Sequence, residues 1–121
     1  MKVTYIELLG KKHPLCFSLA ASEKLDEVFG DLDRMQAELF SGNVKRVVNA
    51  ADTILQVLLN AGRIYMAACG EQLPDPLPCR PADVIDVSDK AALDAIWSSI
   101  KNDSKQEVVT ETKNAEATQG L

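Results

Sequence analysis

The chain has 121 residues, of which 46% are hydrophobic and 26% charged, and its formal net charge is −5. This composition is typical of a soluble globular domain, and no apolar run approaches the roughly 18 residues that a membrane span needs. The acidic balance argues against a protein that binds the phosphate backbone of nucleic acids, because such affinity depends on clustered Lys and Arg. The N-terminus lacks the layout of a signal peptide, so a cytoplasmic location is expected.

The first element predicted is a β-hairpin over residues 2 to 17. Residues 3 to 6 are β-branched or aromatic, and a second short apolar run, residues 15 to 17, follows Gly10-Lys11-Lys12. A glycine-bearing turn between two such runs is typical of a hairpin. Pro14 cannot donate a ladder hydrogen bond and must therefore lie at the start or edge of its strand.

Two short helices are expected next. The first has Ser18 or Ser22 as its N-cap and stops at Gly30, and the second ends at Ser41-Gly42. Over residues 20 to 41 six side chains are acidic and two are basic. A second acidic stretch follows later in the chain, at Asp75, Asp83, Asp86, Asp89 and Asp94. These acids form either the solvated faces of amphipathic helices or a docking surface for a basic partner.

The longest predicted element is a helix over residues 43 to 69, with Asn43 as N-cap and Gly70 as its stop. Its apolar side chains recur at steps of three and four, which places them on one face. They are Val44, Val47, Val48, Ala51, Leu55, Leu58, Leu59, Gly62, Tyr65, Met66 and Cys69, opposite Lys45, Asn49, Asp52, Gln56, Asn60 and Arg63. A helix of about 40 Å needs most of the remaining chain to cover it.

A second apolar strip lies on the back of this helix. Val57 and Ile64 are one heptad apart, and Ala61 lies between them and the main stripe. Either another element of the same chain covers them, or they form a surface for a partner or for self-association. Val57, Ile64 and Ala61 are therefore the candidate partner-binding residues.

The C-terminal third begins with a stiff, proline-rich connection and a short turn of helix from Pro81. Ser88 is the expected cap of a last helix, in which Trp97 packs against the central helix. Residues 102 to 121 are too polar to offset their ordering entropy and are expected to be a disordered tail. The sequence thus predicts a mostly α, α+β domain over residues 1 to 101: a short N-terminal β-hairpin and about four helices around one long helix.

The residue types that carry metal or catalytic chemistry are scattered. His13 and Cys16 form a single His-x-x-Cys pair, while Cys69 and Cys79 are isolated, which is a poor spacing for tetrahedral zinc. An odd number of cysteines without a secretion signal favours three reduced thiols. No catalytic, cofactor-binding or metal-binding residue is assigned, and the protein is not expected to be an enzyme.

The order of these elements resembles the tail assembly chaperones of long-tailed bacteriophages and prophages. The resemblance rests on the hairpin through residues 10 to 19, the acidic helix closing at Phe29-Gly30, the long helix with Leu58-Leu59-Asn60-Ala61-Gly62, and the proline-rich step before the last helix. It implies a non-enzymatic, often homo-oligomeric protein of the bacterial cytoplasm that binds the tape-measure protein, tail-tube subunits or both. The alternative is a small helical adaptor or transcription-associated regulatory protein, in which Lys45-Arg46 at a helix N-terminus meets phosphate.

Overall fold

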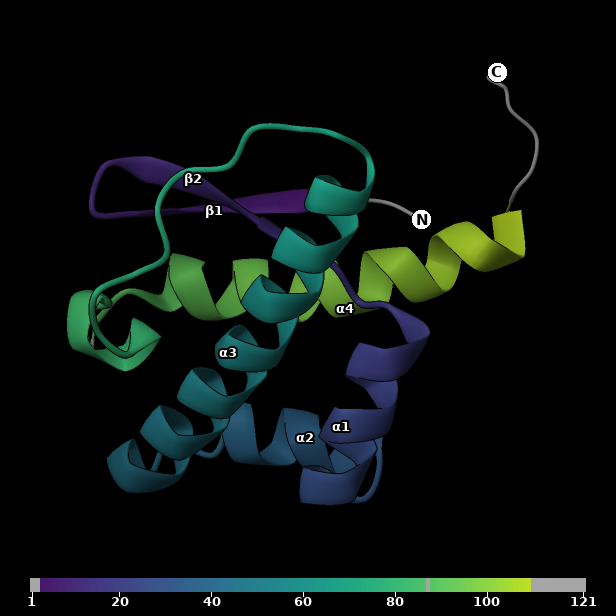
Figure 1. Ribbon diagram of the computed structural model, residues 1–121. Helices are drawn as coiled ribbons and strands as arrows, with labels where there is room; N and C mark the ends of the chain where they lie inside the picture. Colours follow the sequence, from purple (N-terminus) through teal and green to yellow (C-terminus); the bar gives the residue numbers. More distant parts are fainter. Residues whose placement is uncertain (1–2, 87, 110–121) are drawn as a thin grey trace.

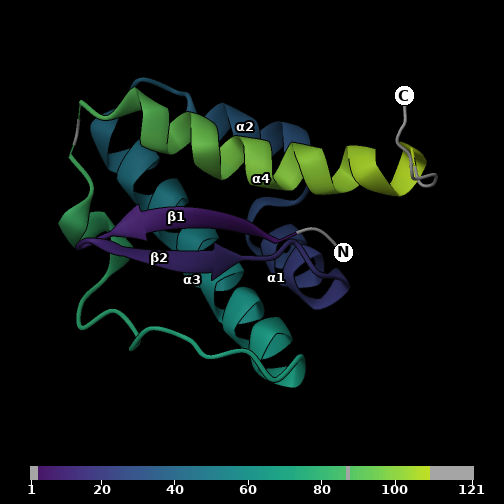
Figure 2. The ribbon, with the colours of Figure 1, turned by 90° about the horizontal axis from the view of Figure 1, so that it is seen from above.

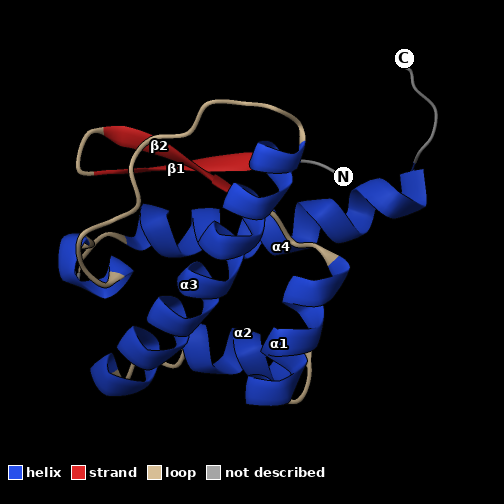
Figure 3. Ribbon diagram, in the orientation of Figure 1, coloured by secondary structure: helices blue, strands red, loops and turns tan. Residues whose placement is uncertain are grey.

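The computed structural model describes residues 3 to 86 and 88 to 109, with side chains to Lys101. Two strands are followed by four α-helices and a short 3₁₀ helix (Figures 1 and 3). The elements are β1 (Thr4–Leu8), β2 (Lys11–Leu15), α1 (Leu19–Phe29), α2 (Leu32–Leu39), α3 (Val44–Ala68), η1 (Pro81–Val84) and α4 (Lys90–Val109). The predicted α+β, mostly helical class with an N-terminal hairpin and one long helix is confirmed.

The hairpin is antiparallel, and its register places Ile6 opposite His13. Leu9 and Gly10 connect the strands with φ values of 53° and 77°. A type I′ turn needs positive φ at both central residues, and its twist matches that of the two strands. Pro14, opposite Tyr5 in this two-stranded sheet, lies on an edge strand as predicted.

Helix α3 runs through the centre of the molecule, and the hairpin lies across it with α4 on the β1 side (Figure 2). Its predicted ends are confirmed. The Asn43 side chain accepts a hydrogen bond from the Arg46 backbone N–H at 3.1 Å, and Gly70 follows the helix with a φ of 80°. Both ends depend on local chemistry: a side-chain cap at the start, and a residue that tolerates positive φ at the end.

Backbone contact between α3 and β2 fixes the hairpin on the helix. A Cβ atom on Gly62 would lie 2.1 Å from the carbonyl oxygen of Pro14, so a residue with a side chain cannot occupy this position without a shift of the backbone. One turn earlier, the Cys16 N–H donates to the carbonyl of Leu58 at 3.3 Å. The core therefore forms where the middle of α3 meets the hairpin.

Several residues of the long helix depart from the predicted faces. Val44 and the C-cap Cys69 belong to the predicted apolar stripe but are exposed. Ile54, outside the predicted stripe, is completely buried.

Asp52, predicted on the solvent side, is only 8% exposed because η1 packs onto it. Its carboxylate accepts hydrogen bonds from the Ala82 N–H at 3.0 Å and from the Gln56 side-chain amide at 2.7 Å. A buried carboxylate is tolerated when it is hydrogen-bonded in this way.

Helix α4 differs from the prediction at both ends. Asp89 rather than Ser88 caps it, accepting from the Ala92 N–H at 3.0 Å. The helix continues to Val109, beyond the predicted start of a disordered tail at residue 102. Once the packed turns containing Ile96 have formed, each further residue adds a hydrogen bond without a new nucleation cost. The remainder of the predicted tail, residues 110 to 121, lies outside the described residues.

Candidate functional site

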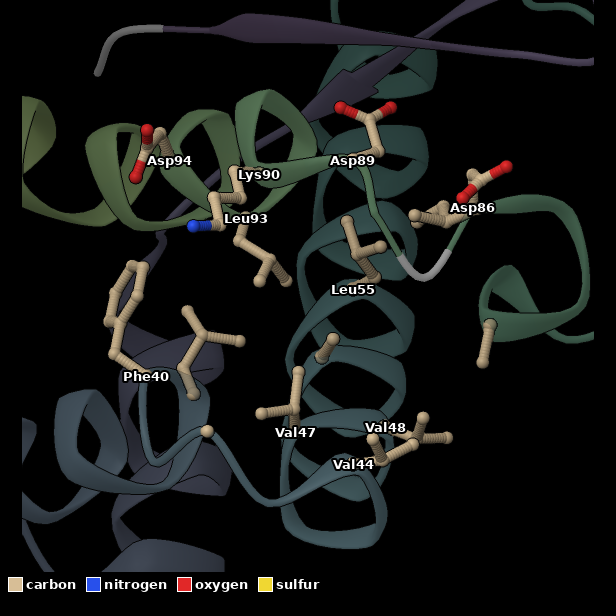
Figure 4. A pocket seen from close by; sticks show the side chains of 15 residues that line it. Phe40, Val44, Val47, Val48, Leu55, Asp86, Asp89, Lys90, Leu93 and Asp94 are labelled. Atoms are coloured by element: carbon tan, nitrogen blue, oxygen red, sulfur yellow. The ribbon is translucent and has the colours of Figure 1, made fainter.

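A groove with a cavity volume of about 680 Å³ lies beside the N-terminal half of α3 (Figure 4). It is bounded by the end of α2, by α3, by the segment around η1 and by the first turns of α4. The lining residues are Leu39, Phe40, Gly42, Val44, Val47, Val48, Ala51, Leu55, Ala82, Ile85, Asp86, Asp89, Lys90, Leu93 and Asp94. Its volume lies within the range of about 300 to 1,000 Å³ that is usual for ligand sites.

The floor of the groove is apolar and belongs to α3. Val44, Val47 and Leu55 follow the same helical spacing as the core residues further along. Helices α2 and α4 pass α3 at different heights (Figure 1), and the groove opens between them. Val44 consequently remains 61% exposed although it continues the apolar stripe.

The side walls are formed by Phe40 and Leu93. Phe40 follows α2 and is 43% exposed, while Leu93 projects from α4 toward Val47 and Leu55 (Figure 4). The ring of Phe40 meets that of Trp97 edge to face, with centroids 6.5 Å apart and planes at 88°. Aromatic pairs favour this edge-to-face geometry. A change in the position of Phe40 therefore alters the surroundings of Trp97, the single tryptophan of the chain.

The rim of the groove is acidic. Its charged residues are Asp86, Asp89, Lys90 and Asp94, three negative and one positive, which gives a formal charge of −2. Within the described chain none of the four takes part in an ion pair. The hydroxyl and then the backbone N–H of Ser88 donate to Asp86 at 2.7 and 2.8 Å and hold the pKa of its carboxyl below the usual value. This rim, referred to below as the acidic rim, carries a negative formal charge and therefore attracts cations.

The structure places the candidate residues of the back strip differently from one another. Val57 and Ala61 are partly buried and pack against the core, whereas Ile64 is 62% exposed. Val57 and Ala61 are therefore covered in part by elements of the same chain, which was one of the two alternatives. The three residues do not form one continuous exposed strip.

The basic pair at the start of α3 is largely engaged. Arg46 donates from Nη2 to one carboxylate oxygen of Glu38 at 2.6 Å and from Nε to the other at 3.0 Å. This bidentate pairing lowers the pKa of Glu38 and occupies the guanidinium fork. Lys45 alone of this pair is left as an exposed cation outside an ion pair in the described chain. The helix end therefore offers a phosphate one cation instead of two.

His13 and the cysteines do not form a common site. His13 is buried on β2, and its ring donates to the backbone carbonyl of Leu8; burial first, then the charges of Arg63 and Lys11, lower its pKa. Cys16 is buried, and Cys69 and Cys79 are exposed. Among the described residues, no three side chains of His, Cys, Asp or Glu are grouped closely enough to hold a metal ion.

In the described chain no helix combines the length and the apolar character that crossing a membrane requires. Comparison with models of protein families, with curated proteins and with solved structures finds no match.

Proposed function

We propose that this protein is a non-enzymatic assembly chaperone of the phage-tail kind, which holds an apolar helical segment of a tape-measure protein in the groove between α2, α3 and α4. The observation that supports it is the open apolar floor on α3. From Val44 to Leu55 the lining of this floor spans twelve residues, about 16 Å at 1.5 Å per residue. Its open part is the first turn, Val44 to Val48, because Ala51 and Leu55 are buried. An amphipathic helix binds by laying its apolar face into such a groove.

The groove favours reversible binding over permanent association. Phe40 and Val44 are already partly covered within the chain, so a partner gains only their remaining exposed area and that of its own side chains. Apolar burial contributes about 25 cal/mol per Å², and association costs several kcal/mol in lost freedom. The net binding free energy is therefore small, and weak binding suits a chaperone that keeps an apolar protein soluble and later releases it. Action as a homo-oligomer in the cytoplasm of a bacterial host, with tail-tube subunits as further partners, belongs to the same proposal.

The test is a titration of the protein with synthetic helical segments of a phage tape-measure protein. Binding is measured by calorimetry and by the fluorescence of Trp97, which contacts Phe40 on the groove wall. We expect one segment to bind at 1:1 stoichiometry and to change the emission. Failure of every tape-measure segment to bind would overturn the proposal.

A matched pair of variants locates the site. Val44→Glu and Ile64→Glu place the same charge on the same helix at positions that are 61% and 62% exposed, one in the groove and one on the back strip. We expect Val44→Glu to weaken binding at least tenfold and Ile64→Glu to leave it unchanged. The opposite result would move the site to the back strip that the sequence predicts.

A further inference from the structure

The hairpin turn carries an unusual residue. Leu9 has a φ of 53°, and in the described chain no other residue except glycine has positive φ. The first central position of such a turn favours Asn, Asp or Gly, since β-carbons crowd the backbone there. The Leu9 side chain is 60% exposed, so it gains little within its own chain from this unfavourable position. Strained residues that persist in a fold are often functional.

Two cations follow this leucine in the chain. Lys11 and Lys12 begin β2 and are exposed, and Glu7, opposite Lys12 in the register, offsets one of the two charges. Within the described residues neither lysine takes part in an ion pair. Residues 9 to 12, referred to below as the hairpin tip, therefore carry one exposed apolar side chain and two exposed lysines.

We infer that the hairpin tip docks into the groove of a second copy of this chain, with Leu9 on the apolar floor and Lys11 and Lys12 beside the acidic rim. The inference rests on the proposed role of the groove as a docking surface. Two strands about 4.8 Å apart make a narrow wedge. The open part of the floor, Val44 to Val48, is about 6 Å long at 1.5 Å per residue. The lysine stems can lie along apolar surface while their ammonium groups reach the rim carboxylates. Charge and polarity of the two surfaces are thus complementary.

The contact must join two chains. In Figure 4 the hairpin strands pass on one side of α4, and the apolar side chains of the groove lie on the other side. Each copy therefore offers one tip and one groove, and the contact is head to tail. Such contacts repeat into rings or open chains. A tape-measure helix and a neighbour's tip would compete for the same groove, so partner binding would disperse the self-associated protein.

The first test is Leu9→Asn, measured by sedimentation velocity of the full chain over a wide concentration range. Asparagine suits positive φ, so the thermal midpoint of this variant should equal or exceed that of the wild type. We expect its association constant to fall at least tenfold. A leucine with a merely structural role would leave association unchanged. Wild-type protein that stays monomeric at all concentrations, or a variant that associates as tightly as the wild type, would overturn the inference.

The second test is a charge swap. Lys11→Glu/Lys12→Glu should abolish self-association, and so should Asp94→Lys, which leaves the helix cap Asp89 and the hydrogen bonds between Asp86 and Ser88 in place. Mixing the two variants should restore binding as a 1:1 complex, because the unaltered tip of the Asp94→Lys variant then meets the unaltered groove of the tip variant. The control Lys24→Glu/Lys101→Glu makes the same change in net charge at exposed positions elsewhere and should associate like the wild type. Absence of a complex in the mixture would contradict the pairing.

These measurements separate the inference from the proposed function, because neither contains a tape-measure segment. The Leu9→Asn variant is then titrated with the segment that binds the wild type. We expect it to bind at least as tightly, since no neighbour occupies its groove. Self-association without segment binding would leave the inference standing and the proposed function wrong. Segment binding by a wild type that never associates would support the proposed function and overturn the inference.

Discussion

The two halves of α3 have the same apolar spacing and different surroundings. In the middle of the helix Ile54, Leu55 and Leu58 are completely buried. At its start Val47 and Val48 are half-buried and Val44 is 61% exposed. The difference comes from the neighbours: β2 contacts the middle of the helix through its backbone, whereas α2 and α4 leave a groove beside its start. Periodicity thus identifies the apolar face of a helix, and the other elements decide where that face is closed.

Replacing Leu58 with Ala tests the closed half and should have the largest effect. The side chain is fully buried, and its removal loses transfer free energy and leaves a cavity. We expect the free energy of unfolding to fall by about 2 to 5 kcal/mol, measured by urea denaturation. A midpoint equal to that of the wild type would show that the middle of α3 is not the core.

Sequence reasoning succeeded where the chemistry is local. Asn43 and Gly70 mark the ends of α3, and Gly10 marks the hairpin turn, because caps and turns depend on a few adjacent residues. The burial of Asp52 was missed because its partner, the Ala82 N–H, comes 30 residues later in the sequence. The placement of η1 on α3, and not the helical period, decides that contact.

The groove was missed for the same reason. Val44, Val47 and Val48 were predicted as core because they continue the stripe, and nothing local reveals that α4 leaves them open. One signal was present: Asp86, Asp89 and Asp94 belong to the acidic stretch for which a docking surface was one interpretation. A charged stretch shows where solvent or a partner lies, and only the fold shows which apolar residues border it.

His13 allows the closed half to be tested by pH. Burial first, then the charges of Arg63 and Lys11, lower its pKa in the folded chain below the 6.5 of the unfolded chain. Between those two values the unfolded chain binds more protons, so stability is complete above about pH 6.5 and falls as the pH is lowered. We expect the free energy of unfolding to decrease from pH 7.5 to pH 5.5.

The variant His13→Gln serves as the control, because an amide still donates to the Leu8 carbonyl but does not titrate in this window. Its stability should change less with pH over the same range. An equal slope in both proteins would assign the pH dependence to other groups and would contradict the desolvation of His13.

The smallest effect is expected at the open end, for Val44→Ser at a protein concentration where the chain is monomeric. Val44 is the first residue of α3 and is 61% exposed. Serine and valine have similar helix propensities, so the substitution changes the stability of the helix little. We expect the free energy of unfolding to stay within about 0.5 kcal/mol of the wild type, as for most surface substitutions. A loss approaching that of Leu58→Ala would mean that the groove is closed in the isolated chain. A loss that appears only at high protein concentration would instead mean that a neighbouring copy covers Val44, because burial between chains contributes to stability by mass action.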